Sequence, residues 1–398
     1  MALVVIVSLP LVGRDQGGGG SGGRLGLWTM LTLPHRPLRI ASAAILTLII
    51  AALITAVLWA ILNAATDATS GSRVDIAHLL RMTALQAGLT MMLSLLVGTA
   101  LAWALNRLRF AGRDLVVGLF AAAIVTPGMV VAFGLLSIWG RNGWINQASE
   151  ALFGVGFDSP AYGLSGILLA HVILDGAFAG RILLARLDAI PHSRLKMGQS
   201  LGLSAWQRFA LIDWPALRGS LPGLGAIIFL LAFTSFPIVL LLGGGPANQT
   251  LEVAIYTAVR LDFDLVGAVR LALTQIGVCS IVILLASAFT PVPSALSRSA
   301  QPSWRDSAPV RVLQWAVLAL GAIGFALPLL SVLYDGLGSG LLRVLGQASF
   351  WRATLTSIVI GGSSALLTLG LALILALGRS AAHRQSGRIL LGIPAFAY

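Results

Sequence analysis

Residues 196–215 read KMGQSLGLSAWQRFALIDWP, a polar and basic interval between two long apolar segments. The pattern predicts two short helices hinged at Gly202, because glycine adopts backbone conformations that other residues avoid. Ser204 is placed to cap the second helix by accepting a backbone N–H hydrogen bond. Pro215 lacks the N–H group needed to continue that helix, so we expect it to end near Trp214.

One face of the predicted second helix carries aromatic side chains. Trp206, Phe209, Ala210 and Asp213 follow helical spacing and should share this face. Two interpretations are open. A partner protein receives the aromatic side chains in a groove, or the helix lies at a membrane interface with its aromatic rings among the lipid headgroups.

The composition around this interval is that of a membrane protein. The 398 residues are 57% hydrophobic and 10% charged, with a mean hydropathy of +0.92, which excludes an ordinary soluble globular domain. We therefore predict an all-α, polytopic bundle of transmembrane helices. The +12 charge does not indicate nucleic-acid binding, because the basic residues lie in short loops between apolar segments. With Cys279 as the single cysteine, disulfides and cysteine-based metal sites within the chain are excluded, and we expect no cofactor or metal.

Eight apolar segments are long enough to cross a bilayer, which requires about 20 residues. They are residues 40–62, 82–105, 115–140, 164–184, 221–242, 271–290, 312–334 and 354–378. Pro127 and Pro237 are expected to kink the third and the fifth of them.

The order of the segments predicts four parts. Residues 1–38, with their flexible GGGGSGG stretch, are expected to lie outside the fold. Residues 39–290 form a first module of about six spans, 291–311 a cytoplasmic linker, and 312–398 the start of a second module. The chain stops within an incipient ninth span, ILLGIPAFAY, so we expect it to be a truncated version of a longer protein.

The distribution of basic residues predicts the orientation in the membrane. With the N-terminus in the cytoplasm, 19 of the 26 Lys and Arg residues fall on the inner side. Membrane proteins retain their basic loops in the cytoplasm. The N-terminus and the interval 196–215 are therefore expected to face the cytoplasm.

An internal repeat supports two modules. A shift of 272 residues superimposes Leu95, Gly98, Ala100, Leu101, Ala104, Leu105 and Arg107 on Leu367, Gly370, Ala372, Leu373, Ala376, Leu377 and Arg379. The small residues Gly98 and Gly370 are expected to permit close helix contact in each copy. The repeat predicts a second polar interval about 272 residues after the first.

Signatures of enzymes are absent from the sequence. Lys196 is the only lysine and has no glycine-rich context, so no P-loop for ATP is present, and HExxH, CxxC and GxSxG do not occur. His171 and Asp175 lie four residues apart within one span and hence on one helical face. Either they form a hydrogen-bonded pair that fixes helix packing, or they line a substrate path, where ionisable groups within membranes are often found.

Two predicted outer segments carry polar and aromatic residues suited to protein contact. Residues 141–163 include Arg141 and Trp144, and residues 243–264 end in an acidic sequence with Asp262 and Asp264. Each segment is either a contact for a soluble partner or an ordinary interfacial helix and connecting loop.

The interval 196–215 resembles the cytoplasmic EAA loop of ABC-importer permeases, which has the pattern EAAxxxG, nine residues, then IxLP. Gly202, Ile212 and Pro215 occupy the matching positions, and Trp206, Gln207 and Phe209 are also common there. Here Lys196-Met197-Gly198 replaces Glu-Ala-Ala, and Trp214 replaces Leu.

The resemblance extends over about residues 40–378 and is greatest to the fused two-module permeases for ferric iron and thiamine, the thiamine type above all. It is carried by GLLSIWGRNGW (134–144), YGLSGILLAHV (162–172), RILLARLDAIP (181–191), LLGGGP (241–246) and LEVAIYTAVRLDFD (251–264). Asp175 and Ala177 stand in a region where such permeases often carry Asn and Pro.

The resemblance implies a transport subunit of the cytoplasmic membrane without an ATP site of its own. A periplasmic binding protein would deliver thiamine or its phosphates to the outer loops, and ATPase subunits would grip the loop at 193–220, with Gly202, Trp206, Gln207, Phe209, Ile212 and Pro215 as the coupling residues. The alternatives are a ferric-iron permease and an ion-coupled secondary transporter, the second supported only by His171 and Asp175.

Overall fold

The computed structural model describes residues 36–66, 75–156, 158–287, 304, 306–338 and 340–381. The predicted N-terminal extension, most of the predicted linker and the incipient ninth span lie outside these residues. Every regular element in the described ranges is a helix, which confirms the all-α prediction.

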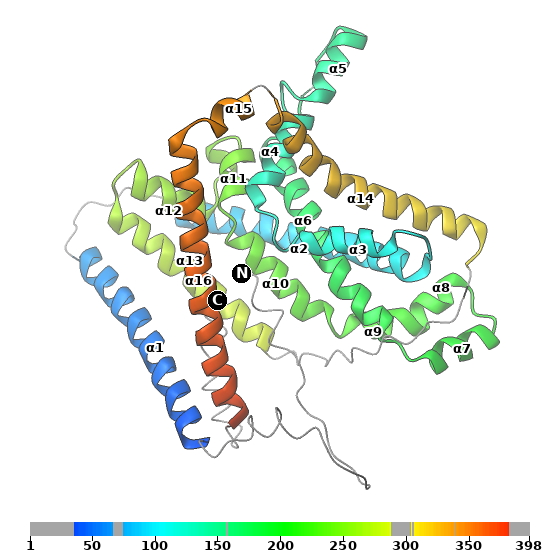
Figure 1. Ribbon diagram of the computed structural model, residues 1–398, viewed down its shortest axis with the longest axis horizontal. Helices are drawn as coiled ribbons and strands as arrows, with labels where there is room; N and C mark the ends of the chain where they lie inside the picture. Colours follow the sequence, from blue (N-terminus) through cyan, green and yellow to red (C-terminus); the bar gives the residue numbers. More distant parts are fainter. Residues whose placement is uncertain are drawn as a thin grey trace. The chain divides into compact units, whose positions relative to one another are not determined.

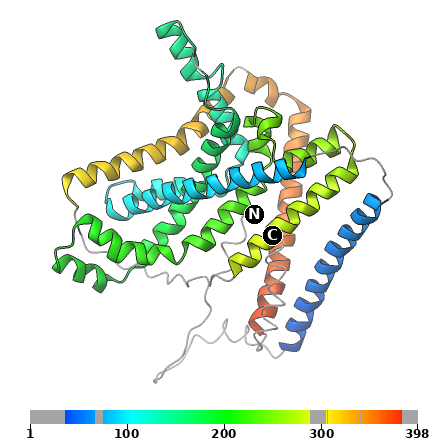
Figure 2. The same ribbon diagram turned by 180° about the vertical axis from the view of Figure 1, so that it is seen from behind.

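The helices follow one another along the chain with short connections (Figures 1 and 2). Their bounds are α1 Arg36–Thr66, α2 Ile76–Arg107, α3 Arg113–Ala122, α4 Gly128–Trp139, α5 Trp144–Phe153, α6 Gly163–Asp188, α7 His192–Ser200, α8 Ala205–Arg208, η2 Phe209–Asp213, α9 Trp214–Arg218, α10 Leu221–Phe233, α11 Pro237–Leu242, η3 Pro246–Asn248, α12 Leu251–Arg260, α13 Leu265–Ser287, α14 Ala308–Gly336, α15 Gly340–Leu345 and α16 Ala348–Ala381.

Six of the described helices are long and apolar enough to cross a membrane, namely α1, α2, α6, α13, α14 and α16. The number becomes seven if the bent pair Ala205–Arg218 and Leu221–Phe233, which meet at 60°, counts as one span. The structure therefore agrees with a polytopic bundle.

Two of the eight predicted spans are not single helices. The third is divided into α3 and α4, and the fifth into α10 and α11, with Pro127 and Pro237 at the starts of the second halves. Kinks were expected at these prolines, and the structure shows complete breaks. Proline lacks a backbone N–H donor, so the helical hydrogen bonds stop before it and a new helix begins.

The described residues form two compact units, one with α1, α15 and α16 and one with α2 to α14. In the first unit α1 packs along α16, and a Cβ atom at Gly378 would overlap with the side chain of Ala43. No described atom lies within 4 Å of the position that a Cβ atom would take at Gly370. The close contact in this copy is thus made at Gly378, and the expectation for Gly370 is not confirmed.

The helix boundaries follow the repeat found in the sequence. The helices α14 and α16 begin at Ala308 and Ala348, each 272 residues after Arg36 and Ile76, where α1 and α2 begin. Matching starts at the same shift are what two copies of one module would produce.

The second unit is organised around α2 and α6, which pack along each other. A Cβ atom at Gly98 would lie 2.5 Å from the Cβ of Ala179 and 2.8 Å from the backbone nitrogen of Gly180. Only glycine permits this separation, so the predicted close contact at Gly98 is confirmed. The core beside it includes Phe120 and Phe325, whose rings meet edge to face with centroids 6.5 Å apart.

We expect Gly98→Ala to lower the thermal stability of the purified protein, by about 1–3 kcal/mol for overpacking a closely packed contact. Gly88→Ala is the matched control, because Gly88 lies on the same helix with no neighbour within 4 Å. Alanine at that position should be neutral or stabilising through its higher helix propensity. Equal melting temperatures for the two variants would contradict the assigned contact.

Candidate functional site

The predicted hinge is the junction between α7 and α8. Gly202 has a φ of +64°, a left-handed conformation that glycine adopts without strain. The Gly202 N–H donates to the Gln199 carbonyl at 3.1 Å, and the Leu203 N–H donates to the Gly198 carbonyl at 3.2 Å. These two bonds form a Schellman motif that ends α7. The predicted turn at Gly202 is therefore present.

The start of α8 is fixed by a capping box. The Ser204 hydroxyl accepts from the Gln207 N–H at 3.3 Å, and the Ser204 N–H donates to Oε1 of Gln207 at 2.9 Å. Both bonds satisfy donors that the first turn of a helix leaves open. The cap predicted at Ser204 is confirmed, and Gln207 has a structural partner within the loop.

The second helix does not end near Trp214, as the sequence predicted, but continues through Pro215 to Arg218. Between Phe209 and Asp213 the backbone forms a π-helical turn, and the Trp214 N–H donates to the Phe209 carbonyl five residues earlier. Because of this wider turn Pro215 falls in the first turn of a new α-helical segment, where a missing N–H costs nothing.

The π-helical turn separates residues that were expected to share one face. The rings of Trp206 and Phe209 stack with centroids 5.9 Å apart, and the Trp206 side chain is 74% exposed. Ile212 and Asp213, by contrast, are buried. A fifth residue in one turn rotates the following side chains relative to an α-helix. Trp206 and Phe209 thus remain together, whereas Asp213 points into the protein.

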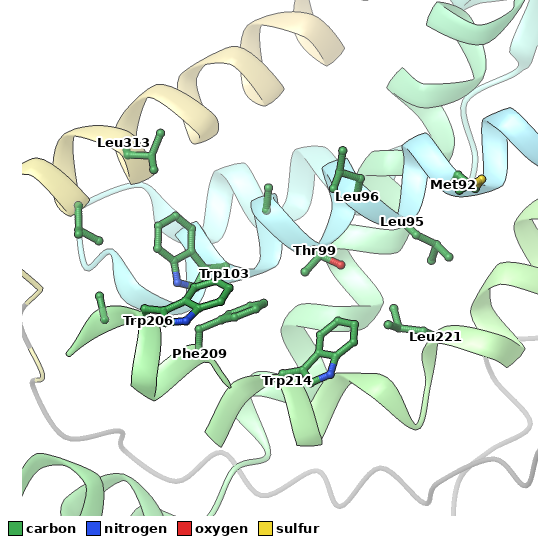
Figure 3. Close-up of a pocket in the computed structure, with 13 residues that line it drawn as sticks. Met92, Leu95, Leu96, Thr99, Trp103, Trp206, Phe209, Trp214, Leu221 and Leu313 are labelled. Atoms are coloured by element: carbon green, nitrogen blue, oxygen red, sulfur yellow. The ribbon is translucent and has the colours of Figure 1, made fainter. Parts of the chain in front are cut away.

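The aromatic residues form one wall of an apolar groove (Figure 3). Its volume is about 650 Å³, and α2 and α14 supply side chains opposite the loop. The lining residues are Met92, Leu95, Leu96, Thr99, Ala100, Trp103, Ala205, Trp206, Phe209, Trp214, Leu221, Val310 and Leu313. Any movement of the loop would change the shape of this groove.

Two buried cations attach the loop to the rest of the unit. Arg107, the last residue of α2, forms an ion pair with Asp213, and both side chains are almost fully buried. Arg208 is also buried, and its guanidinium lies 4.3 Å from the centre of the Trp304 ring. Neither contact was predicted, because nothing in the local sequence indicates which distant residue an arginine will meet.

His171 and Asp175 are buried in α6, with exposed fractions of 3% and 7%. Nδ1 of His171 hydrogen bonds to the Ile167 carbonyl of its own helix at 2.8 Å. Nε2 of His171 and Oδ2 of Asp175 have no hydrogen-bond partner. The interpretation of a hydrogen-bonded His–Asp pair is therefore wrong, and a place on a translocation path stays a prediction.

The four predicted outer contact residues lie at two separate turns. Before α5, the Arg141 guanidinium lies 5.5 Å from the centre of the Tyr162 ring, and the Trp144 ring meets Tyr334 edge to face at 5.6 Å. Between α12 and α13, Oδ1 of Asp264 accepts from the Gly267 N–H at 2.8 Å, whereas Asp262 is exposed. Trp144 and Asp264 thus have partners within the chain, and α5 projects from its unit (Figures 1 and 2).

Sequence comparison relates the chain to proteins that carry a function in their names. It is 41% identical over 307 residues to the thiamine transport system permease protein ThiP of Brucella melitensis, covering 76% of this chain and 56% of that protein. Identity to ThiP of Escherichia coli is 37% over 301 residues, and to ThiP of Haemophilus influenzae 36% over 302 residues. In both cases 75% of this chain and 56% of the relative are covered. The chain is a relative of these thiamine transport permeases.

The resemblance to importer permeases is thereby confirmed, and with the six long apolar helices it identifies a multi-pass protein of the inner membrane. The chain spans 56% of the length of these relatives. No family model matches it. Among solved structures, it is similar to a bacterial alginate ABC transporter in complex with an alginate pentasaccharide-bound periplasmic protein, with 17% identity, a TM-score of 0.49, and coverage of 61% of this chain and 93% of the other.

Proposed function

We propose that this chain is the membrane-spanning subunit of an ABC importer that moves thiamine or its phosphate esters into the cytoplasm by alternating access. The observation that carries the proposal is its identity of 36–41% to permeases named for thiamine transport. The chain itself is not an enzyme in this proposal, and ATP is hydrolysed on a separate subunit.

The proposed site for the ATPase subunits is the segment α7–α9, with Trp206 and Phe209 as contacts and Gly202 as the hinge. Trp206 is exposed and stacked on Phe209, as an aromatic anchor for a partner groove requires. Gln207 fixes the start of α8, and Ile212 and Pro215 support the helical run from within. In this proposal the N-terminus and the loop face the cytoplasm.

The second proposed contact is with a periplasmic substrate-binding protein on the opposite side of the membrane. Arg141 and Trp144 before α5, and Asp262 and Asp264 after α12, are the candidate contacts. The exposed Asp262 and the projecting α5 support this surface. Membrane lipid surrounds the apolar helices, and no contact with nucleic acid is proposed.

The proposed division of the chain remains that of the sequence. A first permease module extends over residues 39–290, a linker over 291–311, and a second module begins at 312. The equal starts of the helix pairs α1 and α14, and α2 and α16, support two copies of one module.

Substrate uptake tests the proposal directly. Cells lacking their own thiamine transport and expressing the full operon should accumulate labelled thiamine and leave labelled ferric iron outside. An operon with this chain deleted is the control. Uptake of iron without thiamine would replace thiamine by iron as the substrate, and thiamine uptake that continues without the ATPase subunit would instead indicate an ion-coupled transporter.

A further inference from the structure

A row of buried polar side chains follows one face of α2. Gln86, Thr90 and Ser94 are spaced by four residues, and each has an exposed fraction of 0%. None of their side-chain polar atoms has a hydrogen-bond partner. Thr83 on the same helix differs, because its hydroxyl donates to the Leu79 carbonyl at 2.6 Å and accepts from the Leu251 N–H at 3.0 Å.

This row lies at the same depth as His171 and Asp175, because α2 and α6 run parallel and in register. A Cβ atom at Gly176 would lie 3.2 Å from the Val97 side chain and 3.9 Å from the Ser94 carbonyl. One turn further on, Gly98 meets Gly180. Ser94 is therefore level with Gly176, the neighbour of Asp175, and Thr90 is one turn earlier, level with His171.

Six buried polar atoms without partners thus occur within about three turns of two adjacent helices. They belong to Gln86, Thr90, Ser94, His171 and Asp175. Each such group costs free energy in an apolar environment, about 1–3 kcal/mol by mutational measures. Ser and Thr in helices readily donate to their own backbone, as Thr83 does, yet Thr90 and Ser94 do not. Hydrogen-bonding capacity is left open at this depth.

Asp175 differs from the other four because it can carry a full charge. The ion pairs that the described residues form are Arg107–Asp213 and Arg113–Asp188, so Asp175 has no cationic partner among them. A carboxylate within a transmembrane helix is costly and commonly marks a substrate or ion pathway. A cation that enters and leaves would supply the missing charge.

We infer that Asp175, with the polar side chains of α2 and α6 at its depth, forms a recognition site within the membrane for the positively charged ring of the transported molecule. The inference rests on the proposed function. Thiamine fits the chemistry, because its thiazolium ring carries a permanent positive charge and its aminopyrimidine ring carries donors and acceptors. The carboxylate pairs with the first ring, and Gln86, Thr90, Ser94 and His171 hydrogen bond to the second.

The test is uptake of labelled thiamine into proteoliposomes that contain the complete transporter, measured together with ATPase stimulation by the loaded binding protein. Asp175→Asn keeps the shape and removes the charge, so we expect uptake to fall about tenfold or more with ATPase stimulation retained. Asp175→Glu keeps the charge and should retain uptake within about threefold of wild type. Ser94→Ala should reduce uptake by a smaller factor.

Asp188→Asn is the matched control, because Asp188 ends the same helix and its side chain is 41% exposed. It should leave uptake within about twofold of wild type, as for an exposed ion pair. Unchanged uptake in Asp175→Asn would overturn the inference, and so would a loss accompanied by loss of ATPase stimulation, which indicates a structural role. If wild-type proteoliposomes take up no thiamine, the proposed function itself fails, and the inference falls with it.

Discussion

Replacing Trp206 and Phe209 together by alanine is expected to separate ATP hydrolysis from thiamine uptake. The two rings stack at 5.9 Å on the exposed side of α8 and η2 and border the groove between the loop and α2. Aromatic anchors of this kind often cost 2 kcal/mol or more when truncated at a protein interface. Uptake should therefore fall by about tenfold or more, because each 1.4 kcal/mol corresponds to a factor of ten.

The measurement compares uptake with ATPase activity in the reconstituted transporter, after copurification has shown that the ATPase subunit is still bound. Phe350→Ala with Trp351→Ala is a matched control, because these residues are another aromatic pair, with centroids 5.3 Å apart, at the start of α16. The control pair should transport normally. Normal uptake in the Trp206/Phe209 variant with the ATPase bound would show that the coupling contact lies elsewhere.

A ligand that drives a conformational change must bind its two states unequally. In the proposed mechanism the ATPase subunits prefer one position of α8 over the other, and the hinge at Gly202 lets α8 move relative to α7. The stacked aromatic rings transmit this preference only if they stay attached to the helix bundle. The attachment is made by the inward-facing side chains of the same segment.

The sequence was sufficient for the local features of this segment. The turn at Gly202 and the cap at Ser204 depend on residues within a few positions of each other, so spacing alone predicted them. The helical end at Pro215 was wrong because the effect of proline depends on its position within a helical turn. The π-helical turn from Phe209 moves Pro215 into a first turn, and no local residue pattern announces such a turn.

Features that depend on distant residues were found only in part. The small residue Gly98 correctly indicated a close helix contact, whereas its counterpart Gly370 did not, and Gly378 makes that contact instead. Small residues permit close packing but do not choose the partner helix. The pairing of Arg107 with Asp213 joins residues more than 100 positions apart, and charge alone cannot select one partner among many.

That ion pair gives the second large expected effect: Asp213→Ala should release the loop from α2. The Arg107 and Asp213 side chains are 2% and 1% exposed, so removing the carboxylate leaves a buried guanidinium without its counter-charge. Such a change costs about 3–5 kcal/mol in other proteins. Faster proteolysis within residues 192–218 and a lower melting temperature should report it. Asp188→Asn, which removes the exposed partner of Arg113, should cost about 0–1 kcal/mol.

A double replacement separates the two roles of the pair. Arg107→Met with Asp213→Leu removes both charges and retains apolar volume, and such replacements of buried ion pairs are often neutral or stabilising. The melting temperature should therefore recover. If the pair also holds α2 to the moving loop, uptake should recover with it, because the apolar contact maintains the same attachment between α2 and η2. Recovered stability without uptake would assign the charges themselves to the transport cycle, and an Asp213→Ala variant as stable as wild type would exclude this pair as the attachment.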